Sequence, residues 1–121
     1  MEKTVLIVDD SATIRNQVRG ILGPVGFRVL EASDGHEGLA LLMREAVDGV
    51  VCDVNMPRMD GLEMLEQMRG EERLRALPVV MLTTEGQPEL IQRAKAAGAK
   101  GWIVKPCKPE LLTGVMKKLL A

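Results

Sequence analysis

With 121 residues, the chain has a common length for one domain and can bury a core without disulfides or structural metals, so we expect a single domain over residues 1–121. Its formal net charge of -1 gives no electrostatic footprint for nucleic acid or an anionic membrane, and no apolar run is long enough to span a bilayer. We therefore expect neither a nucleic-acid nor a membrane partner, and a cytoplasmic location, because the first residues show no signal-peptide pattern.

Short apolar runs alternate with helical periodicities along the whole chain. The expected strands lie at residues 5–8, 27–30, 50–53, 79–82 and 101–104. Apolar residues three and four positions apart indicate helices through residues 14–22, 39–46, 62–68, 90–94 and 112–119. In the second helix we expect four residues to face the core: Leu39, Leu42, Met43 and Ala46. This alternation is typical of a parallel sheet, and right-handed crossovers leave few other arrangements. We therefore predict an α/β fold, a doubly wound five-stranded parallel sheet with helices on both faces.

Four of the five expected strands end in charged or hydroxyl side chains. The third strand is an apolar run that stops at Asp53. A carboxylate at the rim of a dry sheet is costly to bury, but it is well placed for a reaction. The other strands with such ends are followed by Asp9 and Asp10, by Thr83, and by Lys105. In open parallel sheets the working crevice lies at the carboxyl ends of the strands, so we expect these side chains to converge.

The three carboxylates of this set favour a bound metal ion. Taken singly, an Asp-Asp pair is usually a solvated turn, and a hydroxyl at a strand end is usually a helix cap. Carboxylates brought within a few ångströms of one another repel, and each raises the pKa of the others unless a cation lies among them. Oxygen ligands favour Mg²⁺ over zinc or copper. We therefore predict a Mg²⁺ site that includes Asp10 and Asp53.

The same set of side chains suits phosphoryl transfer. Asp53 would attack phosphorus and carry the phosphoryl group as an acyl phosphate, and an ionised carboxylate needs no general base. Catalysis of this reaction is mostly positioning and neutralisation of charge on the phosphoryl oxygens. Mg²⁺ would take one oxygen, Lys105 a second, and the Thr83 hydroxyl a third.

Together these residues resemble the receiver domain of bacterial two-component response regulators, over essentially the whole chain. The resemblance rests on Asp9-Asp10, on Asp53 within Cys-Asp-Val-Asn-Met-Pro-Arg-Met-Asp-Gly, on Thr83 and on Lys105-Pro106. It implies a flavodoxin-like receiver fold with Asp53 as the phosphoacceptor. Because we expect no output domain, the chain is similar to a free-standing regulator of the chemotaxis type, a signalling protein that catalyses only its own phosphorylation and dephosphorylation.

The resemblance also implies a role for each matching residue. Asp10 would hold Mg²⁺ directly and Asp9 largely through water, and the main-chain carbonyl of Asn55 would complete the protein ligands. Lys105 would contact the phosphoryl group, next to a cis peptide bond to Pro106. Thr83 and Trp102 would turn inward and change the surface of the fifth strand and the last helices.

The partners implied are a sensor histidine kinase and a downstream target, such as a flagellar motor switch component or a phosphotransfer protein. We expect the regulator to be a monomer.

The sequence departs from the family pattern at three positions. Trp102 stands where Tyr or Phe is more usual, and its indole is bulkier than the usual switch residue. Thr84 stands where a smaller residue is frequent and would narrow the path of water to the acyl phosphate, and Cys107 stands where Phe often follows Lys-Pro.

Three other functions are compatible with parts of the pattern. A phosphorelay intermediate, which passes its phosphoryl group to another histidine, is the main alternative. An aspartate-nucleophile phosphatase of the haloacid dehalogenase type would need a second Asp where this chain has Asn55, and a cap domain. A flavin-binding electron carrier shares the fold, but one Trp, one Phe and no Tyr offer little for an isoalloxazine ring.

Overall fold

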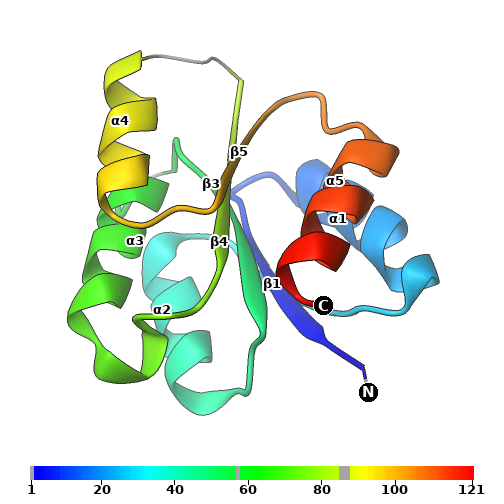
Figure 1. Ribbon diagram of the computed structural model, residues 1–121, viewed down its shortest axis with the longest axis horizontal. Helices are drawn as coiled ribbons and strands as arrows, with labels where there is room; N and C mark the ends of the chain where they lie inside the picture. The colour runs from blue at the N-terminus through cyan, green and yellow to red at the C-terminus, as the bar shows by residue number, and fades with distance from the viewer. Residues whose placement is uncertain (1, 57, 85–87) are drawn as a thin grey trace.

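A five-stranded parallel sheet forms the centre of the computed structural model, which describes residues 2–56, 58–84 and 88–121 (Figure 1). The strand order is β2-β1-β3-β4-β5. The strands are β1 (Thr4–Val8), β2 (Arg28–Ala32), β3 (Gly49–Asp53), β4 (Val79–Thr83) and β5 (Gly101–Val104). Every residue of β1, β3 and β4 is buried, which explains why these strands are continuous apolar runs. The predicted doubly wound α/β fold is confirmed.

Helices cover both faces of the sheet (Figure 1). They are α1 (Ala12–Leu22), α2 (Gly35–Arg44), α3 (Gly61–Gly70), α4 (Pro88–Ala96) and α5 (Pro109–Leu119), with 3-10 turns at Gly23–Val25 and Glu72–Leu74. Side chains alternate between the faces of a strand, so Val5 and Ile7 pack with α1 and α5, whereas Leu6 and Val8 pack with α2, α3 and α4. None of the helices in the described part of the chain has the length and apolar character needed to cross a bilayer.

Two details of the sequence prediction are wrong. β2 runs to Ala32 and not to residue 30, because Glu31 belongs to this edge strand and pairs with Arg15 and with the more exposed Arg19 of α1. α2 ends at Arg44, so Ala46 lies beyond the helix, and Met43 is 40% exposed. The inner face of α2 is instead formed by buried Gly38 and Leu42, with Leu39 partly buried.

Candidate functional site

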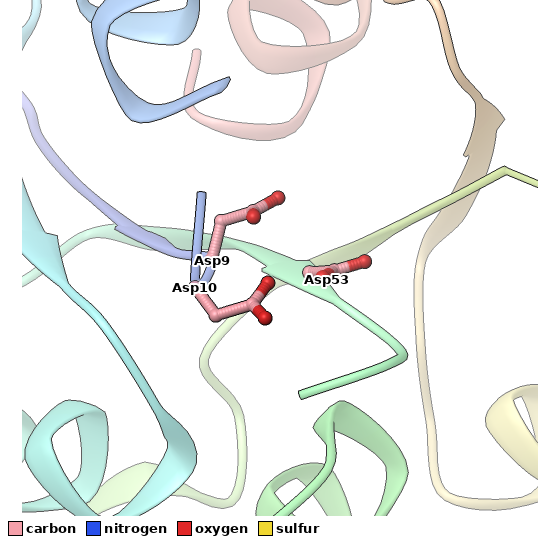
Figure 2. A group of neighbouring side chains, drawn as sticks. All are labelled: Asp9, Asp10 and Asp53. Carbon is pink, nitrogen blue, oxygen red and sulfur yellow. The ribbon is translucent and has the colours of Figure 1, made fainter. Parts of the chain in front are cut away.

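Three carboxylates meet at the carboxyl ends of β1 and β3. One oxygen from each of Asp9, Asp10 and Asp53 lies within 4.8 Å of the others. Figure 2 shows Asp9 and Asp10 at the end of β1 with their side chains directed to the side on which Asp53 lies. Asp9 is fully buried and Asp53 is 4% exposed, whereas Asp10 is exposed. The ladder brings the two strand ends together, because Val8 pairs with Cys52, the residue before Asp53.

Lys105 joins this group from the end of β5. Its Nζ lies 3.2 Å from Asp53 Oδ1 and 3.1 Å from Asp9 Oδ2. The backbone N–H of Lys105 donates to the carbonyl oxygen of Thr83 at 2.6 Å, which ties the residue to the end of β4. The peptide bond from Lys105 to Pro106 is cis, as the resemblance implies. The structure therefore brings together Asp9, Asp10, Asp53 and Lys105.

The surroundings of the Asp53 carboxyl change its pKa. Burial, together with the negative charge of Asp9, raises its pKa to about 6, although the Lys105 ammonium acts in the opposite direction. Burial disfavours the charged form of Lys105, but the adjacent Asp53 and Asp9 outweigh it and raise the pKa of the ammonium. Asp53 is thus ionised at neutral pH, with one ammonium beside it.

The residues of the site fit a hard divalent cation. Asp9 Oδ2 is buried and accepts no hydrogen bond within the described residues, although the Lys105 ammonium lies 3.1 Å away. One ammonium does not balance three carboxylates, and every available ligand atom in this cluster is an oxygen. Such a set favours Mg²⁺ over softer metals.

The remaining predicted residues lie on β4, on β5 and in the loops that follow these strands and β3. Asn55 is exposed in the loop after β3, and Thr83 is the buried last residue of β4, followed by exposed Thr84. Trp102 pairs in register with Met81 of β4 and packs against the core on the α2, α3 and α4 face. Its Nε1 is buried and has no hydrogen-bond partner among the described residues.

Cys107 is partly buried and packs against the core on the other face, so it fills apolar space. The sequence analysis missed the contact between Arg58 of the loop after β3 and Asp34 at the start of α2. No periodicity links two positions that lie 24 residues apart in the chain. Pro57, which belongs to the motif that carries the family resemblance, lies outside the described residues.

Comparison with known proteins identifies the family, because residues 5–117 match the model of the response regulator receiver domain. The chain belongs to this family. It is 41% identical over 116 residues to chemotaxis protein CheY-3 of Vibrio cholerae, covering 95% of this chain and 89% of that protein. It is 39% identical to chemotaxis protein CheY of Pseudomonas aeruginosa, covering 95% of this chain and 94% of that protein.

A solved structure of Vibrio cholerae CheY4 superposes with a TM-score of 0.94 at 42% identity, covering 99% of this chain and all of the other. The predicted receiver family and flavodoxin-like fold are therefore confirmed. As a receiver domain, the chain is a signalling protein, and its acidic cluster lies at the carboxyl ends of the strands, where open parallel sheets bind their ligands.

Proposed function

We propose that this receiver domain accepts a phosphoryl group on Asp53 from a sensor histidine kinase, in a Mg²⁺-dependent step, and signals through altered binding to a partner. The observation that carries the proposal is the position of Lys105 Nζ, 3.2 Å from Asp53 Oδ1 and 3.1 Å from Asp9 Oδ2, at the edge of the carboxylate cluster. This geometry supports the proposal because it puts a carboxylate, an ammonium and further carboxylate oxygens that could hold a metal ion close together.

The reaction follows from the charges of the site. A carboxylate oxygen of Asp53 forms the new O–P bond while the P–N bond of the phosphohistidine breaks, and the bonding pair stays on the imidazole nitrogen. Asp53 has no proton to lose, because its pKa of about 6 leaves it ionised at neutral pH. The Lys105 ammonium then balances charge on a phosphoryl oxygen, and the Thr83 hydroxyl contacts another.

The metal ligands proposed are Asp10 and Asp53 directly, Asp9 largely through water, and the main-chain carbonyl of Asn55. When bound, Mg²⁺ supplies positive charge that lets the carboxylates and the incoming phosphoryl oxygens share one small volume. The chain's own contribution is to hold these oxygens in place on two adjacent strands.

For the biological role we propose chemotaxis signalling by a cytoplasmic monomer. The names of the Vibrio and Pseudomonas relatives support this role, and the target would be a flagellar motor switch component or a phosphotransfer protein. Thr83 and Trp102 would carry the change from the rim to the surface of β5 and the last helices.

The test is covalent labelling with acetyl phosphate and Mg²⁺, followed by intact mass and hydroxylamine treatment. We expect one phosphoryl group that hydroxylamine removes, no label in Asp53→Asn, and no label when EDTA is present. Asp60→Asn is the matched control, because Asn caps the start of α3 as well as Asp does, and it should be labelled like the wild type. A label that persists in Asp53→Asn would overturn the assignment.

A further inference from the structure

The loop between β3 and α3 is fixed at both of its ends. The backbone N–H of Gly61 donates to the carbonyl oxygen of Val54 at 2.9 Å, which closes the loop. Asp60 caps α3 by accepting from the N–H of Glu63, and the Glu63 side chain accepts from the N–H of Asp60 in return. Asn55, whose carbonyl is a proposed metal ligand, lies inside this closed loop.

Arg58 gives the same loop a lateral attachment. It has a φ of 66°, the only positive φ of a non-glycine residue in the described part of the chain. A residue with a Cβ adopts this left-handed conformation at a cost, so other contacts must maintain it. The guanidinium forms an ion pair and a hydrogen bond with Asp34.

Asp34 is a rigid acceptor for this arginine. Its side chain is only 5% exposed, and its Oδ1 accepts from the N–H of Glu37 at 2.9 Å, so it caps α2. That hydrogen bond and the Arg58 guanidinium hold the pKa of Asp34 below its usual value. The charge that Arg58 meets is therefore fixed to the end of a helix.

The residue after Arg58 packs against the same helix end. Met59 is 5% exposed, and a Cβ added to Gly35 would lie 2.8 Å from Met59 Cγ. The absence of a side chain at Gly35 thus lets Met59 approach the backbone of α2. Figure 1 shows that α2 and α3 lie side by side on the same face of the sheet.

We infer that the ion pair of Arg58 with Asp34 is a positioning contact that favours cation binding at the carbonyl of Asn55, three residues earlier in the chain. Arg58 acts through the loop backbone and not as a metal ligand. The inference rests on the proposed function, because it concerns the metal ligand that Asn55 supplies there. Arg58 and Asp34 would then help to set the affinity of the site for Mg²⁺, in addition to the metal ligands themselves.

The test is calorimetric titration of the unphosphorylated protein with Mg²⁺ alone. Asp34→Asn keeps the cap of α2, since Asn is as good a helix cap as Asp, but removes the charge. We expect about threefold weaker Mg²⁺ binding, because the Arg58 side chain is 71% exposed and an exposed ion pair contributes little. Arg58→Ala should weaken binding to the same extent, the double variant should add little more, and Arg58→Lys should restore most of the affinity.

Arg58→Gly separates positioning from stability. Glycine adopts a positive φ without strain, so this variant should unfold at nearly the wild-type urea concentration and still bind Mg²⁺ about threefold more weakly. Glu66→Gln is the control, because it breaks the exposed ion pair of Glu66 with Arg93 and should leave Mg²⁺ affinity unchanged.

Wild-type affinity in both Asp34→Asn and Arg58→Gly would overturn the inference while leaving the proposed function intact. Failure of the wild-type protein to bind Mg²⁺ would overturn both, and labelling of Asp53→Asn by acetyl phosphate would overturn the proposed function separately.

Discussion

At the scale of single residues, the site gathers like charges that oppose folding. Asp9 and Asp53 are both buried, and among the residues that the structure describes Lys105 forms an ion pair with each of them. The raised pKa of Asp53 follows from this conflict, because burial and the charge of Asp9 disfavour ionisation in the folded protein and are absent from the unfolded chain. Phosphorylation chemistry and stability thus make opposite demands on one side chain.

Asp53→Asn should therefore stabilise the metal-free protein at neutral pH. The pKa of Asp53 is about 6 in the folded state against 3.8 for the free group, so the stability that its protonated form supplies below pH 3.8 is lost as pH rises through 6. This difference corresponds to about 3 kcal/mol in the free energy of unfolding at most. Urea denaturation in EDTA should show the advantage of the variant growing between pH 4 and pH 8.

The Asp10→Asn variant is a useful comparison. Asp10 is exposed, so its replacement should raise the free energy of unfolding by less than Asp53→Asn does. Wild-type and Asp53→Asn curves that stay parallel across this pH range would contradict the proposed charge conflict.

Thr84 is the residue expected to control the lifetime of the acyl phosphate. It is exposed and directly follows buried Thr83, so we expect its side chain to narrow the path of water to the acyl phosphate. Thr84→Ala should speed loss of the phosphoryl group severalfold, measured as decay of the labelled mass after the donor is removed. Thr84→Val, which keeps the volume and loses the hydroxyl, should decay like the wild type, and equal rates in all three proteins would rule out crowding.

At the scale of helices and strands, burial on both faces decided what the sequence could predict. β1, β3 and β4 were evident as apolar runs because every residue in them is covered. β2 lies at the edge, where Glu31 is tolerated through Arg15 and Arg19, and so its end was misplaced. The cluster of carboxylates and Lys105 could be predicted because each of its members lies at or just after the end of a strand. The contact of Arg58 with Asp34 could not be predicted, because it depends on how two loops pack, which no local pattern encodes.

The junction of β3 and α3 should not tolerate a side chain at Gly61. A Cβ there would lie 2.0 Å from the carbonyl oxygen of Asp53 and 2.9 Å from its carbonyl carbon, so backbone atoms would have to move. Gly61→Ala should lower the free energy of unfolding by about 3 kcal/mol, as overpacking of a core does, and should slow labelling of Asp53. Urea denaturation and the acetyl phosphate assay measure the two effects.

Gly70→Ala is the matched control at the other end of α3. A Cβ at Gly70 would meet nothing within 4 Å, and alanine favours helix, so this variant should be as stable as the wild type or slightly more stable. Equal losses in the two variants would mean that α3 is sensitive to any added methyl group, and that the approach of Gly61 to Asp53 is unimportant.

At the scale of the whole molecule, β4 and β5 connect the rim to the face covered by α4. The Lys105 N–H donates to the Thr83 carbonyl at the rim, and Met81 pairs with Trp102 further along the same two strands. A hollow of about 100 Å³ lies beside the indole, lined partly by Ile91 and Ala94 of α4. The buried Nε1 has no acceptor among the described residues, so this arrangement of the indole leaves one donor without a protein partner there.

Trp102 should therefore report phosphorylation without an added probe. If the Thr83 hydroxyl turns toward the phosphoryl oxygens, it biases an equilibrium between two states of the β4–β5 region, and the environment of the indole changes with it. We expect Mg²⁺ with beryllofluoride to change Trp102 emission more than Mg²⁺ alone, and Thr83→Ala to abolish the additional change. Thr13→Ala, on the exposed side of α1, should respond like the wild type. If Thr83→Ala showed the same change in emission as the wild type, the hydroxyl and the indole would be uncoupled. The signal would then have to pass through Lys105 and α5, because these follow β5 in the chain.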